Sequence, residues 1–425
     1  PLGSTPTMNS SKRKAKSLNR MVKLITSLCL LLMSAAGLCQ ELQLDTLERY
    51  TARCCYSSWD DKFPLLKRGS SANYFWGHPE LRSFIERDSC FRSLKAAKKQ
   101  ASTCTRLELH DQTQLRYCKG IEKAKNLEYL NLSSVMTERW GNYIREIPRG
   151  VYELRKLRVL VADNSNLKLI SNGIGNLSKL EFLSLSSGDV REIPKELGAL
   201  SKLVALDLSY NELTILPDCL SRLKNLKYLN LAGNALKYVD PNVFMSLKNL
   251  EFLSIQFSGD ASSVNETIEA LSQLPNLKVL HVRYSGLDHM PTTTGGFKSL
   301  EQLSLRGNYG IDLPLTFETL AQIASLRVLD LSFSRIEELP SEIGLLKQVE
   351  TIYLGNWEWC CPRMDFYGTK PYNYVRSLPE SVRGLDNLKH LYLWTWRVSD
   401  SEKESMQKLI PDVHIEFEVK DLLRK

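Results

Sequence analysis

The sequence predicts an α/β solenoid, in which a curved parallel β-sheet is backed by short helical turns. Three observations predict this fold class. A motif of the form L-x-x-L-x-L-x-x-N-x-L recurs, most clearly over Leu203–Leu213 and again over Leu226–Leu236. Successive copies most often start 23 residues apart, and a proline stands at a matching place after many of them. A short fixed period of this kind indicates a stack of similar structural units.

The alternating x-L-x-L part of each copy predicts a short strand whose leucines point inward and whose variable residues point outward. One copy cannot bury its own leucines, but about twelve stacked copies form a continuous core and a curved sheet. A degenerate first copy starts at Cys104, with Leu107 and Leu109 in its strand. The others start at Leu127, Leu157, Leu180, Leu203, Leu226, Leu250, Leu277, Leu300, Leu326, Val349 and Leu388.

The asparagine of the motif can bind backbone groups of adjacent turns that would otherwise lack partners. A serine replaces it in several copies, and Trp357 and Trp396 hold its place in the last two, which predicts an irregular ladder there. The proline is expected at the first position of a short convex-side helix or 3₁₀ turn. These prolines are Pro148, Pro194, Pro217, Pro291, Pro314, Pro340 and Pro379.

Over about three quarters of the chain, this pattern resembles the leucine-rich-repeat family. The 23-residue form L-P-x-x-[IL]-x-x-L-x-x-L-x-x-L-x-L-x-x-N-x-L is similar to the subclass found in Ras-pathway scaffolds and in many bacterial surface proteins. The resemblance implies a horseshoe that binds ligands on its concave sheet or along the rim. It does not identify the ligand, since a fold by itself does not specify a function.

Four regions are expected along the chain. Residues 1–7 resemble a tag remnant, and residues 8–39 resemble an export leader, with a basic stretch and then a signal peptide around residues 21–39. Residues 40–103 are expected to form a helical N-terminal cap. The array fills residues 104–425, with an insertion at 358–375 and a C-terminal cap at 406–425 that includes an edge strand over residues 413–417. An uncleaved membrane anchor and a buried or disordered tail remain alternatives for the leader, and Leu38 before Cys39 departs from the pattern of a lipidation site.

Eight of the ten cysteines follow the leader, and five of these lie between residues 54 and 118. Such clustering before a repeat array favours a disulfide-stapled cap in an exported protein. Cys219 lies inside a repeat and is predicted to be a free core thiol. The disulfide candidates, whose pairing the sequence does not determine, are Cys54, Cys55, Cys90, Cys104, Cys118, Cys360 and Cys361.

Charge and motifs exclude several classes of function. The formal net charge is +8, but residues 1–39 hold six Lys and Arg and no acid, which leaves +2 for the rest. Clustered basic residues that would bind nucleic acid are therefore not evident. The sequence lacks the catalytic motifs H-E-x-x-H and G-x-S-x-G and the phosphate-binding motif G-x-x-x-x-G-K-[ST]. No enzyme activity, cofactor or metal is expected.

The candidate binding surface is the C-terminal half of the concave face. Outward positions lie two, four, six and seven residues after each starting residue, written +2, +4, +6 and +7 below. In the N-terminal copies they include serines, Asp163 and Asp207, whereas from Leu277 onward they carry aromatic residues and arginines, which favour protein contacts. The predicted partner-binding residues are His281, Arg283, Tyr284, Arg306, Tyr309, Phe333, Arg335, Tyr353, Trp359, Tyr392, Trp394 and Arg397.

The insertion at 358–375 is rich in aromatic residues and is interpreted either as a partner contact or as a lid packed on the solenoid. The leading hypothesis is an exported, non-catalytic protein-binding module, secreted or at the cell surface or outer envelope. Three alternatives remain: a structural subunit of a larger membrane-associated envelope assembly, a module that captures glycans or peptides, and an intracellular signalling scaffold.

Overall fold

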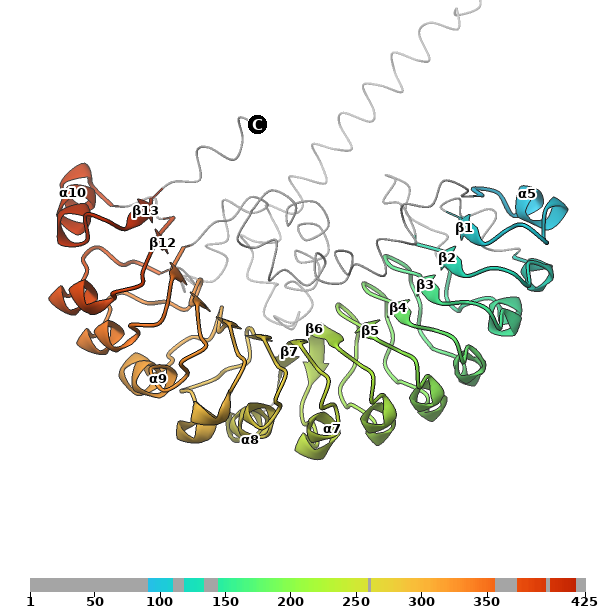
Figure 1. Ribbon diagram of the computed structural model, residues 1–425, viewed down its shortest axis with the longest axis horizontal. Helices are drawn as coiled ribbons and strands as arrows, with labels where there is room; N and C mark the ends of the chain where they lie inside the picture. Colours follow the sequence, from blue (N-terminus) through green and yellow to red (C-terminus); the bar gives the residue numbers. More distant parts are fainter. Residues whose placement is uncertain are drawn as a thin grey trace, which may run out of the picture.

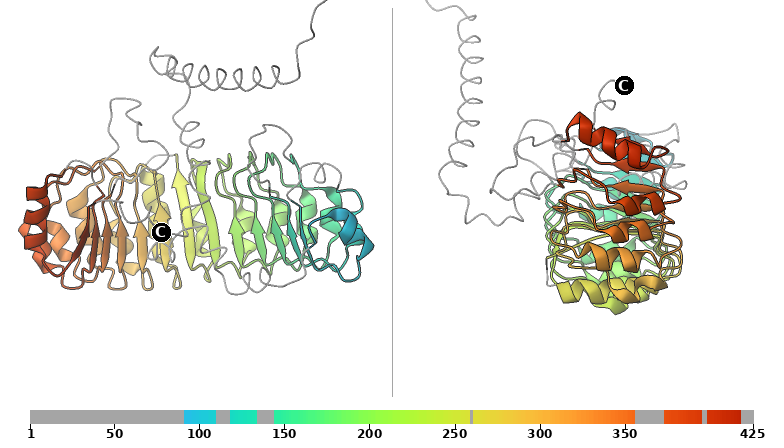
Figure 2. Two further views of the ribbon diagram at one scale, coloured as in Figure 1. Left: turned by 90° about the horizontal axis from the view of Figure 1, so that it is seen from above. Right: turned by 90° about the vertical axis from the view of Figure 1, so that its left-hand side faces the viewer.

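The computed structural model describes residues 91–109, 118–133, 144–258, 261–355, 373–394 and 398–417. These residues form one 13-stranded parallel sheet whose strand order follows the chain from β1 to β13. Figure 1 shows the strands along the inner side of an arc and the helical turns along its outer side, and Figure 2 shows the strands side by side when seen from above. The predicted α/β solenoid is confirmed.

The strands are short because each contributes only the x-L-x portion of its copy to the sheet, except near the middle. The degenerate copy at Cys104 supplies β1, as predicted. The strands are β1 (Arg106–Glu108), β2 (Tyr129–Asn131), β3 (Val159–Val161), β4 (Phe182–Ser184), β5 (Ala205–Asp207), β6 (Tyr228–Leu236), β7 (Phe252–Phe257), β8 (Val279–Val282), β9 (Gln302–Ser304), β10 (Val328–Asp330), β11 (Thr351–Tyr353), β12 (His390–Tyr392) and β13 (His414–Glu416).

The convex side carries mostly 3₁₀ turns, which suit the few residues available between strands. Five of these turns have a proline as the residue before the first helical position, one place earlier than predicted. The 3₁₀ turns are η4 (Ile121–Lys123), η5 (Arg149–Glu153), η6 (Asn172–Asn176), η7 (Lys195–Ala199), η8 (Asp218–Arg222), η9 (Thr292–Gly296), η10 (Ser341–Leu345) and η11 (Glu380–Gly384). The α-helices are α5 (Leu94–Lys99), α7 (Pro241–Met245), α8 (Ala261–Ser272), α9 (Leu313–Leu320) and α10 (Asp400–Leu409).

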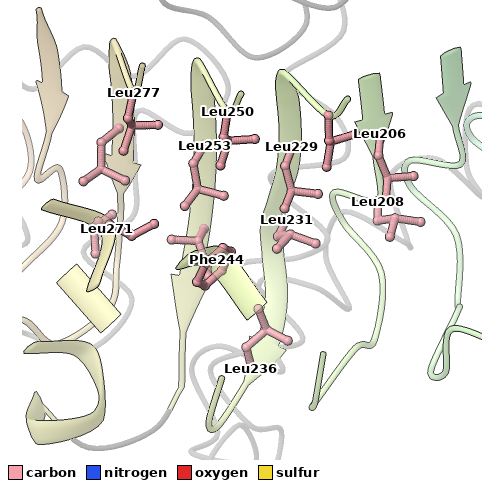
Figure 3. Close-up of a cluster of buried hydrophobic side chains, with 14 of the residues drawn as sticks. Leu206, Leu208, Leu229, Leu231, Leu236, Phe244, Leu250, Leu253, Leu271 and Leu277 are labelled. Carbon is pink, nitrogen blue, oxygen red and sulfur yellow. The ribbon is translucent and has the colours of Figure 1, made fainter. Parts of the chain in front are cut away.

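The core is a ladder of repeat leucines between the sheet and the helical turns. Leu206, Leu229 and Leu253 lie in neighbouring strands in register, and each is fully buried. Figure 3 shows these leucines beside Phe244 of α7, which closes the core from the convex side. Because each leucine contacts its counterparts in the neighbouring repeats, the core is continuous along the array.

The asparagine ladder works as the motif predicts, but in one repeat a different residue supplies it. The Asn308 side chain donates to the carbonyls of Val282 and Leu305, both at 2.8 Å. In the repeat that starts at Val349 this place belongs to Asn373, which donates to Leu331 O and Leu354 O, both at 2.9 Å. The interpretation of Trp357 as the ladder position is therefore wrong, since the extra segment enters before the asparagine.

The two ends of the described sheet differ in how they are finished. Phe91 forms an isolated parallel bridge with Leu107 at the β1 edge, and α5 follows it. At the other end, β13 confirms the predicted edge strand, and α10 starts at Asp400, before the predicted cap boundary at 406. Most of the predicted N-terminal cap lies outside the described residues. None of the helices in the described ranges is long and apolar enough to cross a membrane.

The described cysteines are buried in the core. Cys219 is a free, buried thiol with its Sγ 3.8 Å from the Pro194 carbonyl, as predicted. Cys104 and Cys118 are also buried, and burial raises the pKa of the Cys118 thiol to about 11. Cys54, Cys55, Cys90, Cys360 and Cys361 lie outside the described residues, so the disulfide framework stays a prediction.

Candidate functional site

A column of left-handed backbone runs along one edge of the concave face. The residue at position +7 has φ between 50° and 73° in most repeats. Glycine adopts this conformation freely, whereas bulky side chains do so rarely. The column consists of Asn164, Ser187, Tyr210, Gly233, Tyr284, Gly307 and Phe333. Aromatic side chains at such positions need a compensating contact.

The compensating contact is a glycine in the following repeat. The Tyr284 ring lies against Gly307, where a Cβ atom would collide with the ring, and Tyr210 lies against Gly233 in the same way. Since no side chain stands between ring and backbone, each tyrosine is held flat on the neighbouring turn. The tyrosine rings are thus fixed before any partner arrives, which lowers the entropy that binding would cost.

Five of the predicted residues form two contact groups in neighbouring repeats, together named here the arginine–aromatic cluster: Tyr284, Arg306 and Phe333 in one, and Tyr309 and Arg335 in the other. The Arg306 guanidinium lies 4.2 Å from the Phe333 ring centroid, and its Nε donates to the Tyr284 hydroxyl at 3.2 Å. The Arg335 guanidinium lies 4.4 Å from the Tyr309 centroid. Cation–π contacts of this kind hold the arginines in place without neutralising their charge.

A second group of predicted residues forms an aromatic stack at the C-terminal end of the sheet. The Tyr353 and Tyr392 rings are parallel with centroids 4.7 Å apart, and Trp394 lies 5.0 Å from Tyr392. Trp394 packs on Gly355, where a Cβ atom would collide with its ring. Burial raises the pKa of Tyr353 and Tyr392, so both hydroxyls stay protonated at neutral pH.

The predicted residues lie on or beside the concave sheet as expected, but several are not exposed. His281, Phe333, Tyr353 and Trp394 are each at most 4% exposed. The Arg306 guanidinium lies over the Phe333 ring, Tyr353 stacks on Tyr392, and His281 and Phe252 make a T-shaped ring contact. The expectation that these four side chains face solvent is wrong. Burial also lowers the pKa of His281, so this imidazole stays neutral.

The remaining predicted residues divide into accessible and undescribed ones. Tyr309 and Arg335 are exposed, and Arg283, Tyr284, Arg306 and Tyr392 are half-buried. The Arg283 Nε donates to Ser304 Oγ at 3.1 Å. Trp359 and Arg397 lie outside the described residues.

The sequence interpretation missed an apolar row on the N-terminal half of the concave face. The residues at +2 pair in register from β2 to β8, and with Val161 they form a hydrophobic cluster separate from the main core. A signal was available in the sequence, since apolar residues recur at +2 in these repeats. This apolar stripe consists of Tyr129, Val159, Val161, Phe182, Ala205, Tyr228, Phe252 and Val279.

Two carboxylates accompany the stripe. Asp163 accepts from Ser184 Oγ at 2.6 Å and from the Ser186 amide at 2.9 Å. Asp207 accepts from Ser209 Oγ at 2.6 Å and from Asn230 Nδ2 at 2.9 Å. Burial, and then the charge of Asp207, raise the pKa of Asp163 to about 6. Burial likewise raises the pKa of Asp207.

The repeat geometry agrees with comparisons to known proteins. Residues 163–305 match the family model described as a leucine-rich repeat region. This part of the chain is a leucine-rich-repeat region. The search of curated proteins returned no match to its sequence.

Solved structures resemble this chain in fold. An internalin from Listeria monocytogenes is 19% identical, covering 84% of this chain and 95% of that one, with a TM-score of 0.53. Toll in the Toll–Spatzle complex of Drosophila is 16% identical, with a TM-score of 0.52; the match covers 76% of this chain but only 41% of that one. A leucine-rich-repeat protein of Leptospira interrogans is 22% identical over 78% of this chain and 100% of that one, with a TM-score of 0.47.

Proposed function

We propose that this protein is an exported, non-catalytic binding module that recognises a protein partner through the C-terminal half of its concave face. The arginine–aromatic cluster carries the proposal. It combines fixed aromatic rings with two arginines that keep their charge, and these residue types dominate energetically important protein contacts. The Toll structure is a complex with Spatzle, so a solenoid of similar architecture occurs there in a protein complex.

Export to the cell surface or outer envelope is supported by the leader pattern in residues 8–39 and by the clustered cysteines. A glycan-capturing surface has less support, because the Tyr353, Tyr392 and Trp394 rings already stack on one another. A permanent envelope subunit and an intracellular scaffold remain the alternatives to a surface module.

The test compares two double variants in a pull-down from native membranes and medium. Tyr309→Ala with Arg335→Ala removes the exposed part of the cluster, and we expect partner recovery to fall at least tenfold with unchanged thermal unfolding. Tyr238→Ala with Arg191→Ala is the matched control, since both side chains are exposed and lie outside the cluster. Equal recovery by the two variants would refute the assignment of the surface.

A second pair of variants tests whether fixed rings matter. Gly307→Ala would displace the Tyr284 ring, and Gly233→Ala would displace Tyr210 in the other half of the sheet. Gly286→Ala controls for backbone strain, because its φ is +65° and its added Cβ would meet no atom within 4 Å. We expect only Gly307→Ala to weaken partner binding, and a similar loss in all three would argue against a preorganised cluster.

A further inference from the structure

A row of lysines runs along one rim of the solenoid, at the N-terminal ends of the strands from β2 to β7. In six successive repeats an exposed lysine stands one or two residues before the starting leucine. Because these lysines are 22 to 31 residues apart in the sequence, only the stacking of the repeats brings them together. The lysine row consists of Lys125, Lys156, Lys179, Lys202, Lys224 and Lys248.

Hydrogen bonds between successive turns show that this part of each repeat lies beside its counterpart in the next repeat. Lys156 Nζ donates to Asn126 Oδ1 at 2.7 Å, which joins the first two repeats of the row. At the other end of the row, Asn249 Nδ2 donates to the Lys224 carbonyl at 2.8 Å. With five inter-strand steps of about 4.8 Å, the row from β2 to β7 is roughly 24 Å long.

The rim around the row is strongly basic. In these six repeats, the window from four residues before the starting leucine to one residue after it holds eleven Lys and Arg and four Glu, a formal charge of +7. The same window in the five repeats from Leu277 to Leu388 holds five Lys and Arg and three acids, a formal charge of +2. All residues after Cys39 together also carry only +2, so the fold concentrates positive charge on one half of one rim.

The lysines of the row are not paired with carboxylates. Arg158 pairs with Glu181 at 2.7 Å. Glu251 pairs with Lys227 at 3.4 Å and with Lys278 at 3.1 Å. These five residues stand one place after a starting leucine, whereas the row stands before it. Within the described ranges, none of the six lysines takes part in an ion pair.

The composition of the rim indicates the kind of partner that it can bind. The six windows contain no aromatic residue, so nucleobases would find no side chain to stack on. The row itself consists of lysines, which act as flexible point charges, and not of arginines, whose planar fork matches a single phosphate or carboxylate. Such a rim responds to the density of negative charge and does not require a fixed ligand geometry.

The shape of the solenoid indicates that this partner is a plane. Figure 2 shows the repeats from above as a band between two rims, so the lysines of one rim can contact a flat surface together. Anionic lipid headgroups form such a surface and attract each lysine that comes near it. We propose that the lysine row docks the solenoid, rim first, on an anionic lipid surface.

This orientation leaves the arginine–aromatic cluster clear of the lipid. The cluster lies on the concave face in the repeats that start at Leu277, Leu300 and Leu326, whereas the row ends at the repeat that starts at Leu250. The proposal does not depend on the proposed function, because it concerns a different surface and a different partner.

Cosedimentation with lipid vesicles tests the proposal in the full chain. Two triple variants remove equal charge at exposed side chains that make no ion pair among the described residues. The row variant combines Lys179→Gln, Lys202→Gln and Lys248→Gln, and the control, outside the row, combines Lys168→Gln, Lys195→Gln and Lys237→Gln. The basic residues of positions 1–39 are present in both variants and cannot produce a difference between them.

We expect the row variant to bind vesicles that contain phosphatidylglycerol at least tenfold more weakly than the control, since each lysine near such a surface contributes about fivefold. Salt at about 0.5 M should remove the difference because it screens the charges. Equal binding of the two variants to the anionic vesicles would overturn the proposal. So would a wild-type chain that binds immobilised heparin but not the vesicles, which would assign the row to a soluble polyanion.

Acylation of lysines shows which rim contacts the lipid. The wild-type protein is acylated with and without the anionic vesicles, and the modification of each lysine is measured by mass spectrometry. We expect the lysines of the row to become several times less reactive on the vesicles, whereas Lys168 and Lys237 keep their reactivity. Protection confined to residues 1–39 would show that the N-terminal segment alone binds the lipid, and it would overturn the proposal.

Discussion

Replacing Asn373 with alanine should destabilise the repeat that carries the insertion. The side-chain amide donates to Leu331 O and Leu354 O, and its oxygen accepts from the amides of Ser334 and Ile336 at 2.9 and 3.0 Å. All four bonds are buried. Asn373→Ala leaves four backbone groups without these partners, at about 1 kcal/mol each. The expected loss is therefore about 4 kcal/mol, far above the ~0.5 kcal/mol typical of surface substitutions.

Local measurement suits this variant because repeat arrays need not unfold in a single step. Hydrogen exchange should show that the amides of Ser334 and Ile336 lose protection, and urea unfolding should show an earlier transition. Asn387→Ala is the matched control, since Asn387 donates a single exposed bond to the Lys347 carbonyl at 2.8 Å. If the two variants lose the same stability, Asn373 does not complete the ladder.

Two further predictions concern the N-terminal half. The Asp163→Asn variant should have nearly the same free energy of unfolding as the wild type near pH 4 and a higher one above pH 6. The reason is that the pKa of Asp163 rises from 3.8 in the unfolded chain to about 6 in the folded protein, so ionising this carboxyl costs the wild type roughly 3 kcal/mol of stability. Thermal unfolding at pH 4 and 8 checks this, and equal stability at both values would contradict it. Gly198→Ala should cost about 1–3 kcal/mol because the added Cβ would lie 2.6 Å from the Cys219 carbonyl oxygen, whereas Gly384→Ala, whose nearest contact is 3.3 Å, should cost less. Urea unfolding of both variants compares them, and a larger loss for Gly384→Ala would refute the packing argument.

The sheet could be predicted from the sequence because its driving force is local and repeated. Leucines at fixed spacing must share one side of each strand, and a strand such as β5 has no other way to bury Leu206. The register of all the strands then follows from stacking. The same regularity explains why the ladder residue of the repeat that starts at Val349 was assigned wrongly. The motif places its asparagine eight residues after the starting residue, which leads from Val349 to Trp357. Only the later run Asn373-Tyr374-Val375, which resumes the motif before Pro379, shows where the repeat continues.

The candidate site could be predicted only in part. The outward positions were correct, but exposure depends on neighbours that lie 20 to 40 residues away. Arg306 of the previous repeat lies over the Phe333 ring, and Trp394 packs on Gly355, where the missing side chain leaves room for its ring. A pattern within one repeat cannot reveal such contacts. They follow from comparing the same position in adjacent repeats once the sheet order is known.

The two halves of the concave face therefore differ in the residue types that recur at the same position of successive repeats. From Val159 to Val279 the +2 row is apolar, and Gln302 then interrupts it, while arginines stand at +6 in the repeats that start at Leu277 and Leu300. An apolar row of this extent is expected to lie against another apolar surface. A row of arginines and fixed rings does not need a permanent cover, since its charges remain favourable in water. The C-terminal half is thus the part of the face on which we propose that another protein binds.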